Sequence, residues 1–327
     1  MTAARPGTAG RPVTGDAALT ARLRRALDDA GFAHRIAAVS VAGELAAILA
    51  DLQAAGQVAE TLLAEYAESL GFSCPEEVGT PRALIVVASR SPVVKVLFHL
   101  ESGPFEAVIP PTYISSDAKE RCLEVMRSVL GPAGFEVARA RIPVKLLAVR
   151  TGLAQYGRNN VAYVRNMGSL VRLDAFCTDA PLHVEDHRSK GSWRLSCCPP
   201  CRNCHHVCPT GCIPYDGKVI DAERCLTYFN EHEGEWPEWV DPCGHNSLVG
   251  CMLCQEMCPA NRVHLSIPKV IAEFDREETG WILRGLPAEQ LPPGVRAKLA
   301  ALDLEDYSTV LGRNLRALVA AAKDQAV

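Results

Sequence analysis

Cys198-Pro-Pro-Cys201-Arg-Asn-Cys204-His-His-Val-Cys208-Pro209 is the stretch that decides the fold of the second half of this chain. Its spacing, C-x2-C-x2-C-x3-C-P, is that of bacterial ferredoxins with two iron–sulfur clusters, in which the fourth cysteine binds the other cluster. A second run, Cys251-Met-Leu-Cys254-Gln-Glu-Met-Cys258-Pro259, follows further along the chain. The two runs together predict a pair of [4Fe–4S] clusters.

Each predicted cluster combines cysteines from both runs. Cluster one is expected to be held by Cys198, Cys201, Cys204 and Cys258, and cluster two by Cys208, Cys251 and Cys254. Cluster two then lacks a ligand, because Leu248 stands where a complete second run has a cysteine. Cys225 and Cys243 are the candidates for this eighth ligand, and the spacing does not choose between them.

Zinc and disulfide bonds are the alternative uses for these cysteines. Zinc sites usually pair two separate C-x2-C knuckles, which a 2-2-3 rhythm followed by proline fits poorly. Disulfides need an oxidising compartment, and residues 1–15 lack the apolar core of a secretory signal. The cysteines outside the clusters are expected to be mostly small core residues, namely Cys74, Cys122, Cys177, Cys197 and Cys212.

Length and composition narrow the possible classes of protein. A chain of 327 residues favours about two domains. The net charge of −4 does not draw the protein to nucleic acid or to an anionic membrane, and no stretch is long and apolar enough for a membrane span. Aromatic residues make up 6% of the chain, which argues against stacking platforms for RNA. We therefore expect a cytoplasmic protein with neither a membrane nor a nucleic acid as partner.

Helices and strands alternate in the first half of the sequence. Apolar periodicity predicts helices over 16–30, 43–55, 60–70, 117–130 and 144–153, and strands over 34–41, 82–89, 93–100, 105–109 and 169–176. Asp117 and Glu120 predict a capping box at the start of the fourth helix. This alternation is typical of an α/β, or α+β, domain.

The chain is thus divided into four parts. Residues 1–15 are expected to be disordered, and 16–190 to form the α/β domain, which is a corrinoid or substrate domain on the resemblance described below. Residues 191–265 are expected to form a ferredoxin-like module with two [4Fe–4S] clusters. Residues 266–327 are expected to be a short helical C-terminal segment, with helices around 295–302 and 308–323.

Residues 137–173 contain no acidic side chain but seven basic ones, namely Arg139, Arg141, Lys145, Arg150, Arg158, Arg165 and Arg172. Either this is a solvated basic face, or it is the wall of a pocket for an anionic ligand, because arginine makes bidentate contacts to phosphate. Gly157 and Gly168 beside polar residues suit a backbone that approaches a ligand closely.

Several motifs together resemble the epoxyqueuosine reductase family over residues 110–265. They are Thr151-Gly-Leu-Ala-Gln-Tyr-Gly-Arg-Asn-Asn160, Gly168-Ser169, Leu173-Asp-Ala-Phe-Cys-Thr-Asp179, the first Cys run with Cys208-Pro-Thr, Asp221-Ala-Glu-Arg-Cys225-Leu-Thr-Tyr228, and Gly250 to Asn261. The resemblance implies a cobalamin-binding α/β domain joined to the two-cluster module, as in the related reductive dehalogenases. Electrons would pass through the clusters to the corrin cobalt. The Asp-x-x-x-Cys element of the family assigns the eighth ligand to Cys225.

The chain departs from the family at one position. Three residues before Pro143, where the family has an aspartate as the proposed proton donor, this sequence has Ala140 between Arg139 and Arg141. Without that acid the general-acid role is lost, so epoxyqueuosine itself is not the expected substrate and the chain is expected to be a divergent paralogue. Tyr113, Tyr156 and Tyr163 are substitute donors, since a nearby cation stabilises the phenolate that a tyrosine leaves.

The sequence thus predicts a reductase that relays electrons through two [4Fe–4S] clusters to a cobalamin. Its substrate would be small or nucleotide-like and anionic, and its electron donor a low-potential protein such as a ferredoxin or flavodoxin. Tyr156 and Arg158 are the candidate catalytic residues, and Gly157, Asn160, Gly168 and Ser169 the candidates for corrinoid or substrate binding. The alternative is an iron–sulfur electron-transfer protein without a corrinoid that serves a partner enzyme.

Overall fold

The structure is a computed structural model that describes residues 15–114, 117–184, 193–216 and 219–324. The predicted disordered N-terminus, residues 1–15, lies outside these ranges except for Gly15. Among the helices of the described residues, none is long and apolar enough to cross a membrane.

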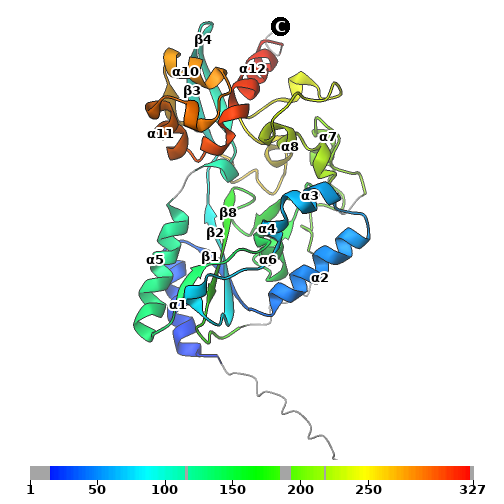
Figure 1. The fold of residues 1–327 in the computed structure, drawn as a ribbon. Coiled ribbons are helices and arrows are strands. Elements are labelled where there is room, and N and C mark those ends of the chain that lie inside the picture. The colour runs from blue at the N-terminus through cyan, green and yellow to red at the C-terminus, as the bar shows by residue number, and fades with distance from the viewer. Residues whose placement is uncertain (1–14, 115–116, 185–192, 217–218, 325–327) are drawn as a thin grey trace, which may run out of the picture.

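A four-stranded antiparallel sheet forms the centre of the N-terminal part (Figure 1). In spatial order its strands are β1 (Ala33–Ala38), β2 (Ala83–Arg90), β8 (Val171–Thr178) and β5 (Val137–Arg139). Successive residues of β2 face opposite sides of the sheet and are buried on both. The uninterrupted apolar sequence of this strand is explained by helices on both faces.

Two helices cover each face of this sheet (Figure 1). On one face α1 (Ala17–Asp29) and α5 (Ala118–Leu130) pack together over Ile85. On the other face α2 (Val41–Ala54) and α6 (Val144–Arg150) pack over Leu84. The short helices α3 (Glu60–Glu65) and α4 (Ala67–Leu70) follow α2, and β6 (Ala154–Tyr156) and β7 (Ala162–Val164) form a hairpin after α6. The predicted α/β class is confirmed.

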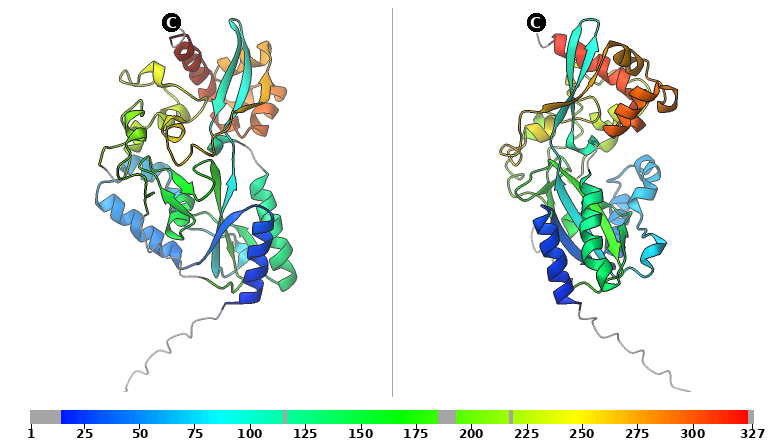
Figure 2. Two further views of the ribbon diagram at one scale, coloured as in Figure 1. Left: turned by 180° about the vertical axis from the view of Figure 1, so that it is seen from behind. Right: turned by 90° about the vertical axis from the view of Figure 1, so that its left-hand side faces the viewer.

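The sequence predicted a helical C-terminal segment, but this segment also contains a strand. Residues Lys269–Phe274 form β9, which pairs in parallel with β3 (Val94–Leu100), and β3 pairs with β4 (Gly103–Ile109). Helices α10 (Arg276–Leu283), α11 (Pro293–Ala301) and α12 (Ser308–Asp324) pack on this second sheet. Figure 2 shows the cyan β3–β4 hairpin beside these orange and red helices. The hairpin was predicted within the domain at 16–190, but it shares its core with the C-terminal residues.

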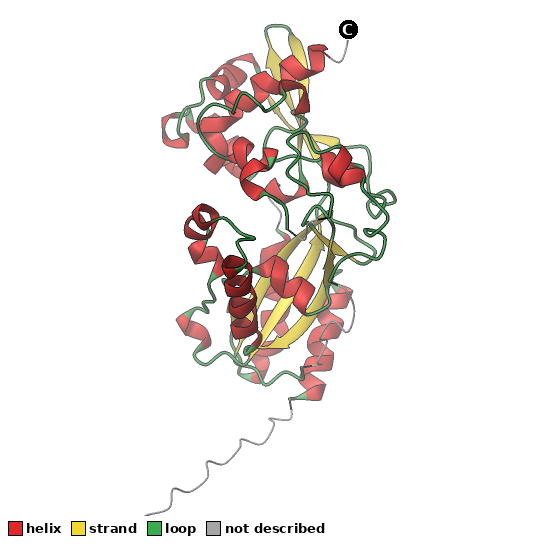
Figure 3. Cartoon of the chain, turned by 90° about the vertical axis from the view of Figure 1, so that its right-hand side faces the viewer, coloured by secondary structure: helices red, strands yellow, loops and turns green. Residues whose placement is uncertain are grey.

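The cysteine-rich part between the two sheets consists mainly of loops (Figure 3). Its helices are short: α7 (Asn203–His206), α8 (Leu226–Glu231) and α9 (Leu253–Glu256). A segment with so little regular structure has few backbone hydrogen bonds of its own, so its shape depends on side-chain contacts with its neighbours.

One local prediction was wrong. The side chain of Asp117 makes no capping hydrogen bond at the start of α5, so the capping box is absent. Cys74 and Cys177 pack in a hydrophobic core, as expected from the sequence, but they are also joined in a disulfide. Disulfides persist mainly in oxidising environments, so this bridge does not support the compartment expected from the sequence.

We predict that Phe274→Ala lowers the free energy of unfolding by about 3–5 kcal/mol, the usual cost of removing a buried phenylalanine. The ring of Phe274 is fully buried and stacks on Phe98 with centroids 5.3 Å apart, which joins β9 to β3. Urea unfolding followed by tryptophan fluorescence measures the effect. Val270→Ala on the exposed side of β9 is the matched control and should cost less than about 1 kcal/mol. Equal effects would contradict a core role for the strand.

Candidate metal centre

The first group of thiols brings together both cysteine runs. Helices α7 and α9, which carry Cys204 and Cys254, are in contact. Burial raises the pKa of Cys204 to about 11, and the negative charges of Cys198, Cys258 and Cys201 add to the effect. These four thiols therefore lie within electrostatic reach of one another, which is the set predicted for cluster one.

The second group contains Cys208, Cys225, Cys251 and Cys254. Burial raises the pKa of Cys251 to about 11; a hydrogen bond from Asn246 opposes the shift, and the charges of Cys225 and Cys208 reinforce it. Burial also raises the pKa of Cys254, with Cys251 and Cys225 contributing. Cys243, the other candidate for the eighth ligand, is exposed. The position of Cys225 supports its assignment, which remains a prediction.

The thiols form two groups, and four thiolates are the usual ligand set of a [4Fe–4S] cluster. Within the described part of the chain, no three or more His, Cys, Asp or Glu side chains are placed to hold one metal ion.

Two amide side chains donate to sulfur atoms of the second group. The Nδ2 of Asn246 lies 3.2 Å from the Sγ of Cys251, and the Nδ2 of Asn159 lies 3.5 Å from the Sγ of Cys254. Hydrogen bonds to cluster sulfurs tune reduction potentials. The sequence did not point to either asparagine, although Asn159 adjoins the predicted Asn160.

Arg158, a predicted catalytic residue, supports the first cysteine run. Its side chain is buried, and its guanidinium donates to the carbonyl of Cys198 at 3.0 Å and to the carbonyl of Tyr215. Its Nη atoms are therefore used in holding a loop. A catalytic role for Arg158 remains a prediction, and these contacts give it a structural one.

Two of the four predicted cofactor-binding residues, Gly168 and Ser169, contact the end of the second cysteine run, and the other two adjoin Asn159. A Cβ at Gly168 would meet the Oδ1 of Asn261 at 2.3 Å. Ser169 donates its N–H to that same oxygen and its hydroxyl to Gln255, both at 2.8 Å. Gly157 and Asn160 form the turn that presents Asn159, and Asn160 has a left-handed backbone with φ of 59°. These groups dock the module; their role toward a corrinoid remains a prediction.

Lys145 on α6 lies within electrostatic reach of the second group. Its side chain is exposed to water, and the surrounding protein lowers its pKa, while the negative charge of Cys225 partly opposes the shift. The Nζ lies 5.9 Å from the ring centroid of Tyr156, whose own pKa burial raises to about 12. The sequence named Lys145 only as one of seven cations.

The other two candidate tyrosines are engaged near the thiols. Tyr113 donates its hydroxyl to Glu231, and burial raises the pKa of both groups. The hydroxyl of Tyr163 accepts from Asn159 at 3.0 Å and also bonds with Cys258. Of the three tyrosines, Tyr156 is the one that lies beside Lys145.

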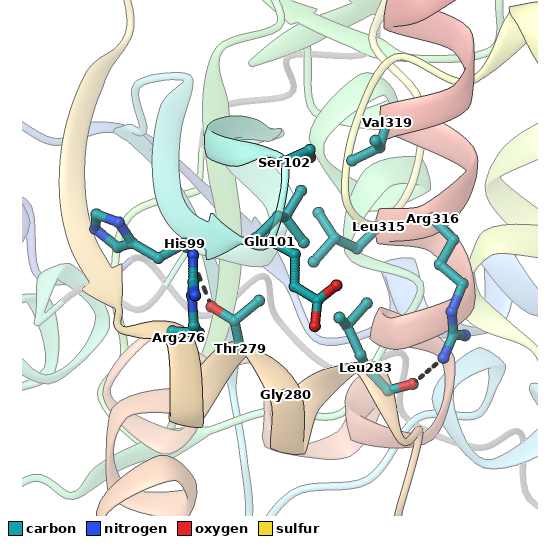
Figure 4. A pocket seen from close by; sticks show the side chains of 11 residues that line it. His99, Glu101, Ser102, Arg276, Thr279, Gly280, Leu283, Leu315, Arg316 and Val319 are labelled. Atoms are coloured by element: carbon teal, nitrogen blue, oxygen red, sulfur yellow. Dashed lines mark hydrogen bonds between the residues drawn. The ribbon is translucent and has the colours of Figure 1, made fainter.

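A separate cavity of about 450 Å³ lies between the β3–β4 hairpin and helices α10 and α12 (Figure 4). Leu283, Leu315 and Val319 form part of its wall, and His99 donates its backbone N–H to Thr279 at 3.2 Å. None of its described lining residues is a cysteine or a tyrosine.

The comparisons with known proteins agree on the cysteine-rich part. Residues 197–261 match the family model described as a 4Fe-4S double cluster binding domain. The epoxyqueuosine reductase of Escherichia coli is 36% identical over 129 residues, 38% of this chain and 32% of that protein. That of Pseudomonas aeruginosa is 32% identical over 148 residues, 44% and 39% of the two chains. The match thus spans about a third of the curated relatives' length.

Solved structures of epoxyqueuosine reductases share the fold over most of both chains. That from Streptococcus thermophilus superposes with a TM-score of 0.63 at 16% identity, over 92% of this chain and 81% of the other. A selenomethionine-labelled epoxyqueuosine reductase gives 0.67 at 15% identity, over 94% and 82%. At such identities the likeness concerns the fold.

We predict that Cys258→Ala lowers the iron content of the anaerobically reconstituted protein by about half, because one of two [4Fe–4S] clusters loses a ligand. Iron and sulfide analysis measures the loss. Cys122→Ala, which removes a buried free thiol in α5, is the control and should keep all the iron. Loss of both clusters from Cys258→Ala alone would contradict the division into two groups.

The motifs, the double-cluster domain and the fold agree, and the resemblance inferred from the sequence is confirmed. Part of the chain is similar in sequence to the epoxyqueuosine reductases, the described residues share their fold, and residues 197–261 match a double-cluster [4Fe–4S] binding domain.

Proposed function

We propose that this protein is a reductase that passes electrons through its two [4Fe–4S] clusters to a cobalamin and from there to a small, anionic substrate. The electrostatic contact between the two parts of the chain is the observation that carries the proposal. The charge of Cys225, in the cysteine module, acts on Lys145 of the α/β domain, whose Nζ lies 5.9 Å from the ring centroid of Tyr156. An electron that leaves cluster two there would meet whatever the α/β domain binds.

The surroundings of Lys145, Tyr156 and Cys225 suit a redox reaction that is partly shielded from bulk water. Cys225 is half-buried, and Lys145 is desolvated by the surrounding protein. A bound cobalamin would supply a strongly reducing metal at this place. Lys145 would hold an anionic group of the substrate, and Tyr156 would hold a proton at its hydroxyl, since burial raises its pKa to about 12.

The substrate differs from that of the relatives in our proposal. Ala140, which replaces the family's acid, donates its N–H to the carbonyl of Ala175 at 2.9 Å and offers no ionisable group. Lys145 lies on the same segment, beyond Pro143, and supplies a positive charge instead. An anionic compound thus suits the site beside Lys145 better than a substrate that needs a general acid as proton donor.

A nucleic acid is a candidate carrier of the substrate in our proposal. One solved epoxyqueuosine reductase of the same fold, with a TM-score of 0.63, is bound to an epoxyqueuosine-modified tRNA stem loop. The composition argument against RNA therefore has less force than the sequence suggested. A low-potential ferredoxin or flavodoxin remains the proposed electron donor, because iron–sulfur clusters reach very low potentials.

We predict that the anaerobically reconstituted protein binds hydroxocobalamin and, after partial reduction, gives the spin-resonance signal of base-off Co(II) beside the cluster signals. Gel filtration followed by cobalt analysis measures the binding. Protein without clusters, prepared in parallel, shows whether binding depends on the module.

A protein with full iron content and no bound cobalt would contradict the cobalamin proposal. That result would favour the alternative of an iron–sulfur electron-transfer protein serving a partner enzyme. The two functions are thus separated by one pair of measurements on the same sample.

We also predict that bound hydroxocobalamin protects Lys145 from an amine-reactive ester at pH 8. A lowered pKa leaves a larger fraction of neutral amine at a given pH, so free Lys145 should react faster than an ordinary exposed lysine. Peptide mass spectrometry measures the labelling, with Lys269 on the exposed part of β9 as the control. Equal labelling of Lys145 with and without cobalamin would place the cofactor elsewhere.

A further inference from the structure

Cys212 is a buried thiol that the predicted cluster ligands do not include. It is 3% exposed and follows Cys208 in the turn Cys208-Pro-Thr-Gly-Cys212, where Gly211 has a φ of +64°. Its Sγ lies 3.5 Å from the Sγ of Cys208. The sequence predicted a small core residue, but the thiol lies against a predicted ligand.

Cys212 also contacts the other ligand that reaches cluster two from outside the second run. Its thiol forms a hydrogen bond with the thiol of Cys225. Its carbonyl accepts from the N–H of Asp221 at 2.9 Å, which ties Cys212 to the segment that ends in Cys225. One thiol is thus held between Cys208 and Cys225 by both side-chain and backbone contacts.

The arrangement favours a hydrogen-bond donor over a ligand. Cys208, Cys225, Cys251 and Cys254 already supply the four thiolates of a [4Fe–4S] cluster. A fifth thiol at hydrogen-bond distance from a ligand sulfur can donate its S–H to it. Reduction adds negative charge to the cluster and its sulfurs, so a donor stabilises the reduced state and raises the reduction potential.

We propose that Cys212 does not bind iron but donates its one S–H to the sulfur of Cys208, beside Cys225, and thereby raises the reduction potential of cluster two. The proposal rests on the two-cluster part of the proposed function and is independent of cobalamin. Cys212 would thus set how easily cluster two, the cluster near Lys145, accepts an electron.

The test compares Cys212→Ala, Cys212→Ser and Cys225→Ala in the full-length protein, reconstituted anaerobically without cobalamin. Iron and sulfide analysis counts the clusters, and a redox titration followed by spin resonance gives the midpoint potential of each. Cluster one is the internal control, and Cys122→Ala controls for the loss of a buried thiol elsewhere.

We expect Cys212→Ala to keep all its iron, with the potential of cluster two shifted to a more negative value and that of cluster one unchanged. Cys212→Ser should lie closer to the unmodified protein, because a hydroxyl also donates. Cys225→Ala should lose about half the iron, as one of two [4Fe–4S] clusters.

Three results would overturn the proposal. An unchanged potential of cluster two in Cys212→Ala would show that the thiol donates nothing to it. Iron loss in both Cys212 variants with full iron in Cys225→Ala would make Cys212 the ligand. Loss of both clusters from the Ala and Ser variants alike would make Cys212 a requirement for assembly. Each concerns the clusters alone, so failure of cobalamin binding is a separate outcome.

Discussion

The side chain of Asn261 joins the second cysteine run to the α/β domain, and much of the site depends on it. It is fully buried, accepts from the N–H of Ser169 at 2.8 Å, and donates to the hydroxyl of Ser169 at 2.7 Å and the carbonyl of Gln255 at 2.8 Å. A buried amide whose groups are all paired fixes one arrangement, because any other would leave polar groups unpaired. The glycine at 168 leaves the room this contact needs.

That docking explains why the module can be made largely of loops. Buried polar groups hold these loops. From the α/β domain, Arg158 donates to the carbonyl of Cys198 and Asn159 donates to Cys254; within the module, Asn261 donates to the carbonyl of Gln255. The motif residues at 157–169 thus contribute by holding the cysteine module in position. The residues that the sequence predicted as a ligand-binding loop hold the thiols. The candidate substrate site beside them is formed by Lys145 on α6 and Tyr156 on β6.

The parts that could be predicted from sequence are those fixed by local pattern. The apolar run of β2, the helix α5 and the spacing of the cysteines each depend on near neighbours in the chain. The strand β9 could not be predicted in the same way, because Val270 and Ile271 are exposed and the strand exists through its pairing with β3. Cys212 and Lys145 were missed for a similar reason: their surroundings come from distant segments.

The disulfide between Cys74 and Cys177 has a consequence for how the molecule is connected. It closes a loop across a sequence separation of 103 residues, and the β3–β4 hairpin lies inside that loop. The hairpin belongs to the core of the C-terminal sheet, whereas the bridge itself lies in the N-terminal one. One hairpin of the C-terminal core therefore lies within a loop that the disulfide closes, and a chain cut inside that loop stays one molecule until the bridge is reduced.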